Sequence, residues 1–120
     1  MNAVINLIKT HWLTITMCLL AAIATLSLWP AESLPRVPGS DKTHHFISYG
    51  ALVFPLALRK PNYWLWIIFA FVAFSGAIEL IQPYVNRYGE WLDMAANVAG
   101  LACGVVIAQL LLFFCSKNTK

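Results

Sequence analysis

Long apolar runs, separated by short polar or proline-rich breaks, dominate the chain. They predict four helices, over about residues 12–29, 42–58, 63–82 and 90–115. At about 1.5 Å per residue the first run is roughly 26 Å long, close to the hydrocarbon thickness of a bilayer. We therefore predict an all-α fold in which residues 1–120 form a single domain, a membrane-spanning bundle of four transmembrane helices.

The helix boundaries carry recognisable start and stop signals. Three prolines and Gly39 break the linker before the second helix, and Ser40 and Asp41 offer it an N-cap. Pro55 predicts a kink, a tilt or an early stop near the end of that helix, and Pro83 ends the third. Because the second helix is also the least hydrophobic of the four, we expect it to pack inside the bundle or to line a cavity.

Composition narrows the class of protein. Hydrophobic residues make up 60% of the chain and charged residues 11%, against roughly a quarter charged in a soluble domain. The chain has no basic run of the kind that binds nucleic acid. Cys18, Cys103 and Cys115 lie in apolar runs without metal-ligand spacing, so we expect them to be small buried residues.

The first apolar run also resembles the core of a signal peptide, because a basic residue precedes it. Bulky Leu28 and Trp29 follow its nearest small-residue site, Thr25-Leu26-Ser27, which disfavours cleavage. We expect the first helix to be retained.

The charges predict an orientation. With four spans, five basic residues fall on the face that holds the termini, namely Lys9, Arg59, Lys60, Lys117 and Lys120, and three on the other, namely Arg36, Lys42 and Arg87. By the positive-inside rule this excess places both termini in the cytoplasm. All five acids fall toward the opposite face, so any chemistry is expected to face outward.

Polar side chains gather at the outward ends of the last three helices. Asp41, His45 and Tyr49 share one face of the second helix, whereas His44 points elsewhere. Glu79, at membrane depth, needs a partner or a proton and is a functional-site candidate by default. The predicted ligand-binding set is Asp41, Lys42, His45, Tyr49, Glu79, Gln82, Arg87, Asp93 and Asn97.

Parts of this set also have structural interpretations. An Arg87–Glu79 ion pair could simply hold the corner between helix and loop, and Asp93 could complement the positive N-terminus of the fourth helix. Gly100-x-x-x-Gly104 predicts close helix packing, within the bundle or in a homo-oligomer.

The order and spacing of these residues resemble the VanZ-like family of small membrane proteins. The resemblance extends from about residue 30 to 108 and rests on Asp41-Lys42-x-x-His45-Phe46-x-x-Tyr49, Glu79-x-x-Gln82, Arg87 and Asp93-x-x-x-Asn97-x-x-Gly100. It implies a multi-pass protein of the bacterial inner (cytoplasmic) membrane. Through the founding member it also implies a link to low-level resistance to the glycopeptide teicoplanin. It implies no settled reaction.

Three functions fit these observations. The first is non-enzymatic binding of a lipid headgroup or lipid-linked envelope precursor, with Lys42 and Arg87 on its anionic group. The second is an intramembrane hydrolase or transferase acting on a lipid headgroup, with Glu79 or His45 as the general base. The third is a scaffold or subunit. A metal-assisted enzyme would use His45, Asp41, Glu79 and Asp93. Because the sequence has no paired-histidine signature, we predict neither a metal nor a cofactor.

Overall fold

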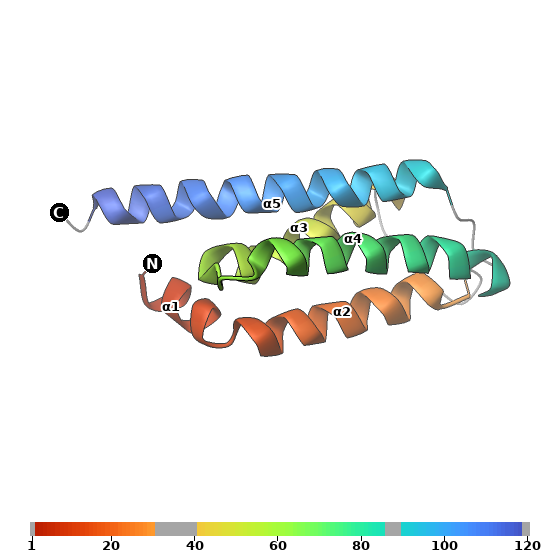
Figure 1. Ribbon diagram of the computed structural model, residues 1–120, viewed down its shortest axis with the longest axis horizontal. Coiled ribbons are helices and arrows are strands. Elements are labelled where there is room, and N and C mark those ends of the chain that lie inside the picture. The colour runs from red at the N-terminus through yellow and green to blue at the C-terminus, as the bar shows by residue number, and fades with distance from the viewer. Residues whose placement is uncertain (1, 31–40, 86–89, 119–120) are drawn as a thin grey trace.

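The computed structural model describes residues 2–30, 41–85 and 90–118, and of Asp41 the backbone alone. Arg36, Ser40 and Arg87, to which the sequence assigns roles, lie outside this part of the chain. The described residues form an all-α fold of five α-helices and one 3-10 turn (Figure 1). In order these are α1 (Asn2–Thr10), α2 (Trp12–Leu28), α3 (Asp41–Arg59), α4 (Trp64–Ile81), η2 (Gln82–Val85) and α5 (Trp91–Lys117).

Helices α2, α3, α4 and α5 lie within two residues of the predicted ranges at each end, whereas α1 was not predicted. α1 meets α2 at a bend of 72°. In its last turn the Thr10 hydroxyl donates a 2.8 Å hydrogen bond back to the carbonyl of Asn6, a local bond that often accompanies a bend. The first apolar run is therefore preceded by a separate short helix.

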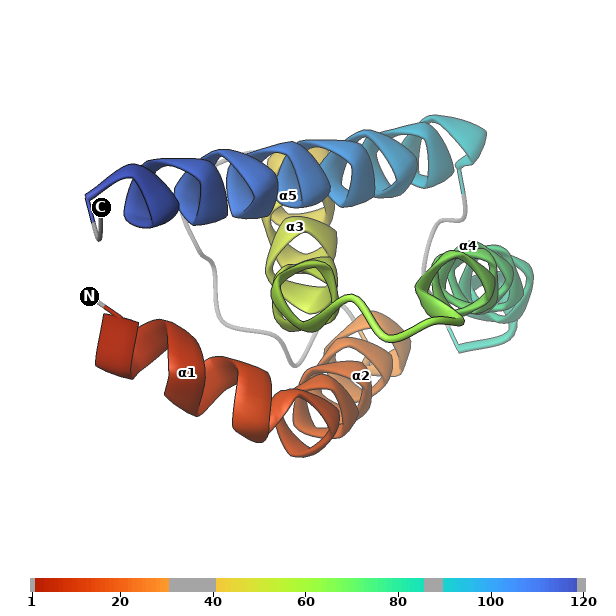
Figure 2. The ribbon, with the colours of Figure 1, turned by 60° about the vertical axis from the view of Figure 1, so that its left-hand side comes forward.

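Helix α3 occupies the middle of the bundle, between α5 on one side and α2 on the other (Figure 2). Tyr49, Leu52, Val53 and Leu56 recur at helical spacing and are 0–1% exposed. This confirms the expectation that the least hydrophobic predicted helix packs inside. Pro55 does not end it, since α3 continues to Arg59.

The most extensive helix contact joins α3 to α5, and two glycines make it possible. A Cβ at Gly104 would lie 2.6 Å from the Gly50 carbonyl oxygen, and one at Gly100 would collide with the carbonyl of Phe46. The small-residue stripe of α5 thus serves packing within the chain, and α3 covers it.

The turn between α3 and α4 leaves one carbonyl that its own helix does not satisfy. Lys60, with a φ of 47°, ends α3, and its amide donates to the carbonyl of Leu56. Pro61, next in the chain, has no N–H for the carbonyl of Ala57. The side-chain amide of Gln109 on α5 donates to that carbonyl instead, at 3.0 Å. A polar residue in the apolar half of α5 therefore completes the end of α3.

Two segments of the described chain are long and apolar enough to cross a bilayer. They are Trp64–Val85, which joins α4 to η2, and Trp91–Lys117 of α5. The bent pair of α1 and α2 is a third if the two helices form one span. These apolar helices make the chain a multi-pass membrane protein. Helix α3 is less apolar than these segments, so its composition alone does not show that it crosses the membrane.

The expected burial of the cysteines is wrong. Cys18 and Cys103 are exposed, and Cys115 is half-buried. They lie on helices with outward apolar faces, and a small apolar side chain suits a lipid-facing surface as well as a core. In the described part of the chain none of the three forms a disulfide.

Candidate functional site

A hydrogen-bonded chain of side chains joins α3, α5 and α4 near one end of the bundle. The amide nitrogen of Asn97 donates to the hydroxyl oxygen of Ser75 at 2.6 Å. His45 Nδ1 lies 3.0 Å from the amide oxygen of Asn97, which accepts its proton. Asn97 and Ser75 are 0–1% exposed. Three helices are thus tied together by polar groups inside an apolar bundle.

Asp93 lies between this chain and a more accessible ion pair. Lys42 Nζ is 3.0 Å from a Glu90 oxygen and 3.7 Å from Asp93 Oδ1. His45 Nε2 is 3.9 Å from Asp93 Oδ2. Lys42 lies in the first turn of α3 and donates a hydrogen bond to Glu90. The site therefore has a buried carboxylate, that of Asp93, next to a half-exposed ion pair, that of Lys42 and Glu90.

Glu79 reaches from α4 to the beginning of α5. Its Oε2 accepts a 2.9 Å hydrogen bond from the backbone N–H of Glu90, the N-cap residue of α5. The positive end of the helix dipole favours a carboxylate there. Within the described residues the other oxygen, Oε1, is buried without a hydrogen-bond partner. One oxygen of Glu79 thus has a structural contact and the other does not.

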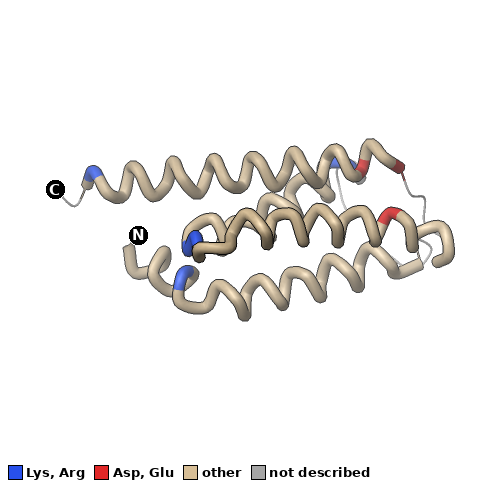
Figure 3. The backbone as a smooth tube through the Cα atoms, in the orientation of Figure 1, with Lys and Arg blue, Asp and Glu red and all other residues tan. Residues whose placement is uncertain are grey.

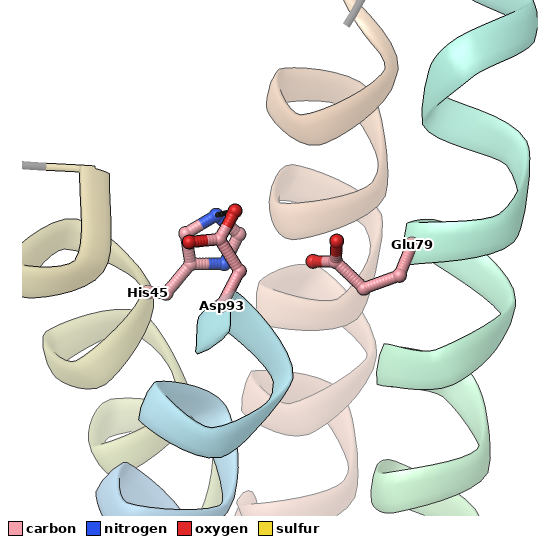
Figure 4. A group of neighbouring side chains, drawn as sticks. All are labelled: His45, Glu79 and Asp93. Atoms are coloured by element: carbon pink, nitrogen blue, oxygen red, sulfur yellow. Dashed lines mark ion pairs between the residues drawn. The ribbon is translucent and has the colours of Figure 1, made fainter. Parts of the chain in front are cut away.

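His45, Glu79 and Asp93 face one another from three helices. Each offers one ligand atom, and the three atoms lie within 4.8 Å of one another. Figure 4 shows the Glu79 carboxylate reaching from α4 toward the side chains of His45 and Asp93. One imidazole nitrogen and two carboxylates can bind a cation or share a proton. We call the following residues the polar cluster: Lys42, His45, Ser75, Glu79, Glu90, Asp93 and Asn97.

The structure brings together much of the predicted binding set. Five of its members lie in the polar cluster: Lys42, His45, Glu79, Asp93 and Asn97. Tyr49 lies one turn beyond His45, and it shares a hydrogen bond with Ser75. The preference for His45 over His44 agrees with this arrangement, because His45 is the histidine that contacts Asn97 and Asp93.

The remaining predicted residues lie elsewhere or cannot be placed. Gln82, on η2, donates its amide to the carbonyl of Ser27 at 3.1 Å and so ties η2 to the end of α2. Arg87 and the side chain of Asp41 lie outside the described residues. Ser75 and Glu90 were missing from the predicted binding set. Ser75 stands one turn before Glu79, and Glu90 three residues before Asp93, so helical spacing was the signal that could have added them.

Two hollows in the described surface lie at the opposite end of the molecule. One, of about 260 Å³, is formed by α1 and the C-terminal part of α5, and the other, of about 420 Å³, by α1, α2 and Arg59. The polar cluster itself is built of side chains in contact with one another. A ligand as large as a lipid headgroup would have to displace one of these contacts, most readily the Lys42–Glu90 pair.

A comparison with protein-family models matches residues 2–113 to the VanZ/LLP1 family. The chain belongs to this family. The match begins in α1 and reaches into the last turns of α5, so it includes every residue of the polar cluster. Neither the curated proteins nor the solved structures contain a significant match. The resemblance drawn from the sequence motifs is thereby confirmed, and this VanZ/LLP1 protein presents a charged site on an apolar bundle.

Proposed function

We propose that this VanZ/LLP1 protein binds the headgroup of a membrane lipid or of a lipid-linked envelope precursor at the polar cluster. The observation that carries the proposal is the Lys42–Glu90 pair, whose side chains are 47% and 54% exposed. It lies directly beside buried Asp93, at the end of an otherwise apolar bundle. An ammonium group suits a phosphate, and carboxylates suit hydroxyl or amino groups of a headgroup.

Apolar side chains beside the cluster would accommodate the rest of such a ligand. Trp91 and Leu92 follow Glu90 on α5 and are exposed, and Tyr84 on η2 is 89% exposed. Aromatic residues at this position are typical of the membrane interface. A lipid could thus place its headgroup on Lys42 and its chain along the outer face of α5.

We place the polar cluster at the outer leaflet of the bacterial inner membrane, with α2, α3, α4 and α5 as four crossings and both termini in the cytoplasm. The support is the distribution of charge: at the end of the bundle that holds the termini the described charges are Lys and Arg, whereas the acids lie at the other end (Figure 3). An outward-facing headgroup site is compatible with a role in teicoplanin resistance, because that antibiotic is a lipid-tailed ligand of cell-wall precursors.

Native mass spectrometry of protein purified from its own membranes tests the binding proposal. We expect a specific lipid adduct on the wild type that is lost in Lys42→Ala and in Glu90→Gln. Arg59→Ala, which removes a cation at the opposite end, should retain it. Bulk phospholipid alone, bound equally by all four proteins, would contradict the proposal.

An enzymatic role is the second candidate, because His45, Asp93 and Glu79 are close enough to move a proton together. In this case the adduct would change in mass with time, and Glu79→Gln would bind the same adduct without converting it. If the cluster is only a scaffold, all variants would bind the same lipids, and the effects of Glu79→Gln and His45→Ala on unfolding would be strongly non-additive.

A further inference from the structure

The polar cluster has a surplus of negative charge. Among its described residues Glu79, Glu90 and Asp93 carry three negative charges against the one positive charge of Lys42. With a neutral imidazole the formal charge is thus −2. Two of these carboxylates belong to residues that are only 6% exposed, Glu79 and Asp93. Buried charges are costly unless they are paired, so this arrangement favours a bound cation.

Two carboxylate oxygens in this site have no hydrogen-bond partner among the described residues. They are Glu79 Oε1 and Asp93 Oδ1, and both atoms are buried. The nearest ammonium, that of Lys42, is 3.7 Å from Asp93 Oδ1, which is beyond hydrogen-bonding distance. The second oxygen of Glu79 is already used by the Glu90 amide. The unpartnered oxygens are therefore available to a metal ion.

The imidazole of His45 is held in the orientation that a metal ligand requires. Asn97 donates through its nitrogen to Ser75, so its oxygen is the group that faces His45 Nδ1 and accepts the Nδ1 proton. The lone pair of a neutral imidazole then lies on Nε2, which faces Asp93 Oδ2 at 3.9 Å. Metal-binding histidines are commonly oriented by such a hydrogen bond from the other ring nitrogen.

We propose that His45, Glu79 and Asp93 form a binding site for one divalent transition-metal ion, for which Zn²⁺ is the best match. The ligand atoms would be His45 Nε2 and one oxygen from each carboxylate. Ligand atoms about 2.0–2.2 Å from a tetrahedral Zn²⁺ lie about 3.4 Å from one another. The three ligand atoms here lie within 4.8 Å of one another, so small side-chain rotations would bring them to that spacing. The imidazole disfavours Mg²⁺ and Ca²⁺, which prefer sites made entirely of oxygen.

Three protein ligands leave one coordination position open, as in catalytic rather than structural zinc sites. A water molecule or a phosphate oxygen would complete the sphere. The metal site goes beyond the proposed headgroup binding and does not depend on it, because its ligands are two buried carboxylates and the partly buried imidazole of His45, and no lipid group is needed.

The test is a titration of purified, chelator-stripped protein in a non-ionic detergent without added lipid. We expect Zn²⁺ to bind with a stoichiometry of about one per chain, and Co²⁺ to give the visible absorption of a tetrahedral site. His45→Ala and Asp93→Asn should weaken binding at least 100-fold. Asn97→Leu removes the bond that orients His45, together with the bond to Ser75, but no ligand atom, and should weaken Zn²⁺ binding about 10-fold or more. His44→Ala is the matched control and should bind as the wild type does.

Glu79→Gln guards against variants that merely misfold, since its amide oxygen can still accept from Glu90. It should remain folded, lose tight Zn²⁺ binding and lose the rise in Tm that Zn²⁺ gives the wild type. The proposal is overturned if the stripped wild type binds no Zn²⁺, or if His45→Ala retains the Co²⁺ spectrum. Either result would leave the lipid adduct experiment unaffected, and loss of the adduct would leave metal binding unaffected.

Discussion

Asn97 is the residue on which the geometry of the polar cluster depends most directly. Its side chain is 1% exposed and bridges His45 on α3 to Ser75 on α4. The amide nitrogen donates to Ser75, so the amide oxygen is the atom that faces His45 and accepts its proton. A buried amide in this position therefore orients an imidazole and joins three helices at once.

We expect Asn97→Ala to lower the free energy of unfolding by about 1–3 kcal/mol, because it takes this partner from the imidazole N–H of partly buried His45 and from the buried hydroxyl of Ser75. Thermal unfolding in detergent measures the effect. Asn62→Ala, at an exposed position in the turn between α3 and α4, is the control and should change stability little. Equal losses in the two variants would show that the bridge is not a specific contact.

Two properties of the Glu79 side chain, its hydrogen-bond acceptor and its negative charge, can each stabilise the start of α5, and two substitutions distinguish them. Its Oε2 accepts from the amide of Glu90 at the beginning of α5. By comparison with helix capping, we expect Glu79→Ala to cost about 0.5–2 kcal/mol of stability and to speed amide exchange in the first turn of α5. Glu79→Gln keeps an acceptor and should cost less. If the two variants are equally destabilised, the charge of Glu79 and not its hydrogen bond supports the helix.

At the scale of elements, the contact between α3 and α5 determines which side chains meet. Because Gly100 and Gly104 carry no Cβ, α5 can lie against the backbone of α3 at Phe46 and Gly50. That close approach lets Asn97, one turn before Gly100, reach His45. The glycine stripe and the polar cluster are thus consecutive parts of one interface.

We expect Gly100→Ala to destabilise the fold by about 1–3 kcal/mol, since its new methyl group would collide with the Phe46 carbonyl and force the helices apart. Gly76→Ala in α4 is the matched control. There the Cβ would lie 3.5 Å from Met94 Cε, an ordinary contact, and the gain in helix propensity of about 1 kcal/mol should raise stability. Unfolding curves of the two variants in the same detergent should therefore shift in opposite directions.

The four longer helices and the inward position of His45 were predictable from the sequence, because they follow from its composition and its periodicity. Apolar runs indicated α2, α3, α4 and α5, and helical spacing placed His45 on the inward face of α3. The short helix α1 was not predicted. Its nine residues directly precede the first apolar run, and no proline or glycine in the sequence marks a boundary between the two. Helical spacing alone did not add Ser75 to the predicted binding set.

Contacts between segments that are far apart in the chain could not be predicted from the sequence, and the reason is physical. The hydrogen bond from Glu90 to Glu79 depends on how the start of α5 packs beside the last turns of α4. Likewise, Gln82 lies near Glu79 in the chain, yet its amide is turned to the end of α2. Such choices are made by the packing of whole helices, which neither spacing nor composition specifies.

At the scale of the whole molecule, the bundle has two chemically different ends. The end that holds both termini carries Lys9, Arg59, Lys60 and Lys117 among the described charges, and the other end carries the polar cluster (Figures 1 and 3). Cations near the ends of transmembrane helices favour the cytoplasmic face. A protein of this shape would expose a basic surface on one side of the membrane and a charged, acid-rich site on the other.

This asymmetry predicts which side chains a membrane-impermeant thiol reagent reaches in intact cells. Cysteines introduced one at a time at Trp29 and Tyr84 should be labelled from outside, and those at Lys9 and Lys60 only after the membrane is permeabilised. The background is a variant in which serine replaces Cys18, Cys103 and Cys115, because in the described part of the chain none of these cysteines forms a disulfide.

The four positions together test the number of crossings as well as the orientation. Opposite labelling of Lys9 and Trp29 requires α2 to cross, and opposite labelling of Trp29 and Lys60 requires α3 to cross, although α3 is less apolar than its neighbours. If Trp29 and Lys60 are labelled from the same side, α3 does not span the membrane. The interior position of α3 makes crossing the expected outcome, because α5 and α2 cover so much of its surface that few of its side chains need to face lipid.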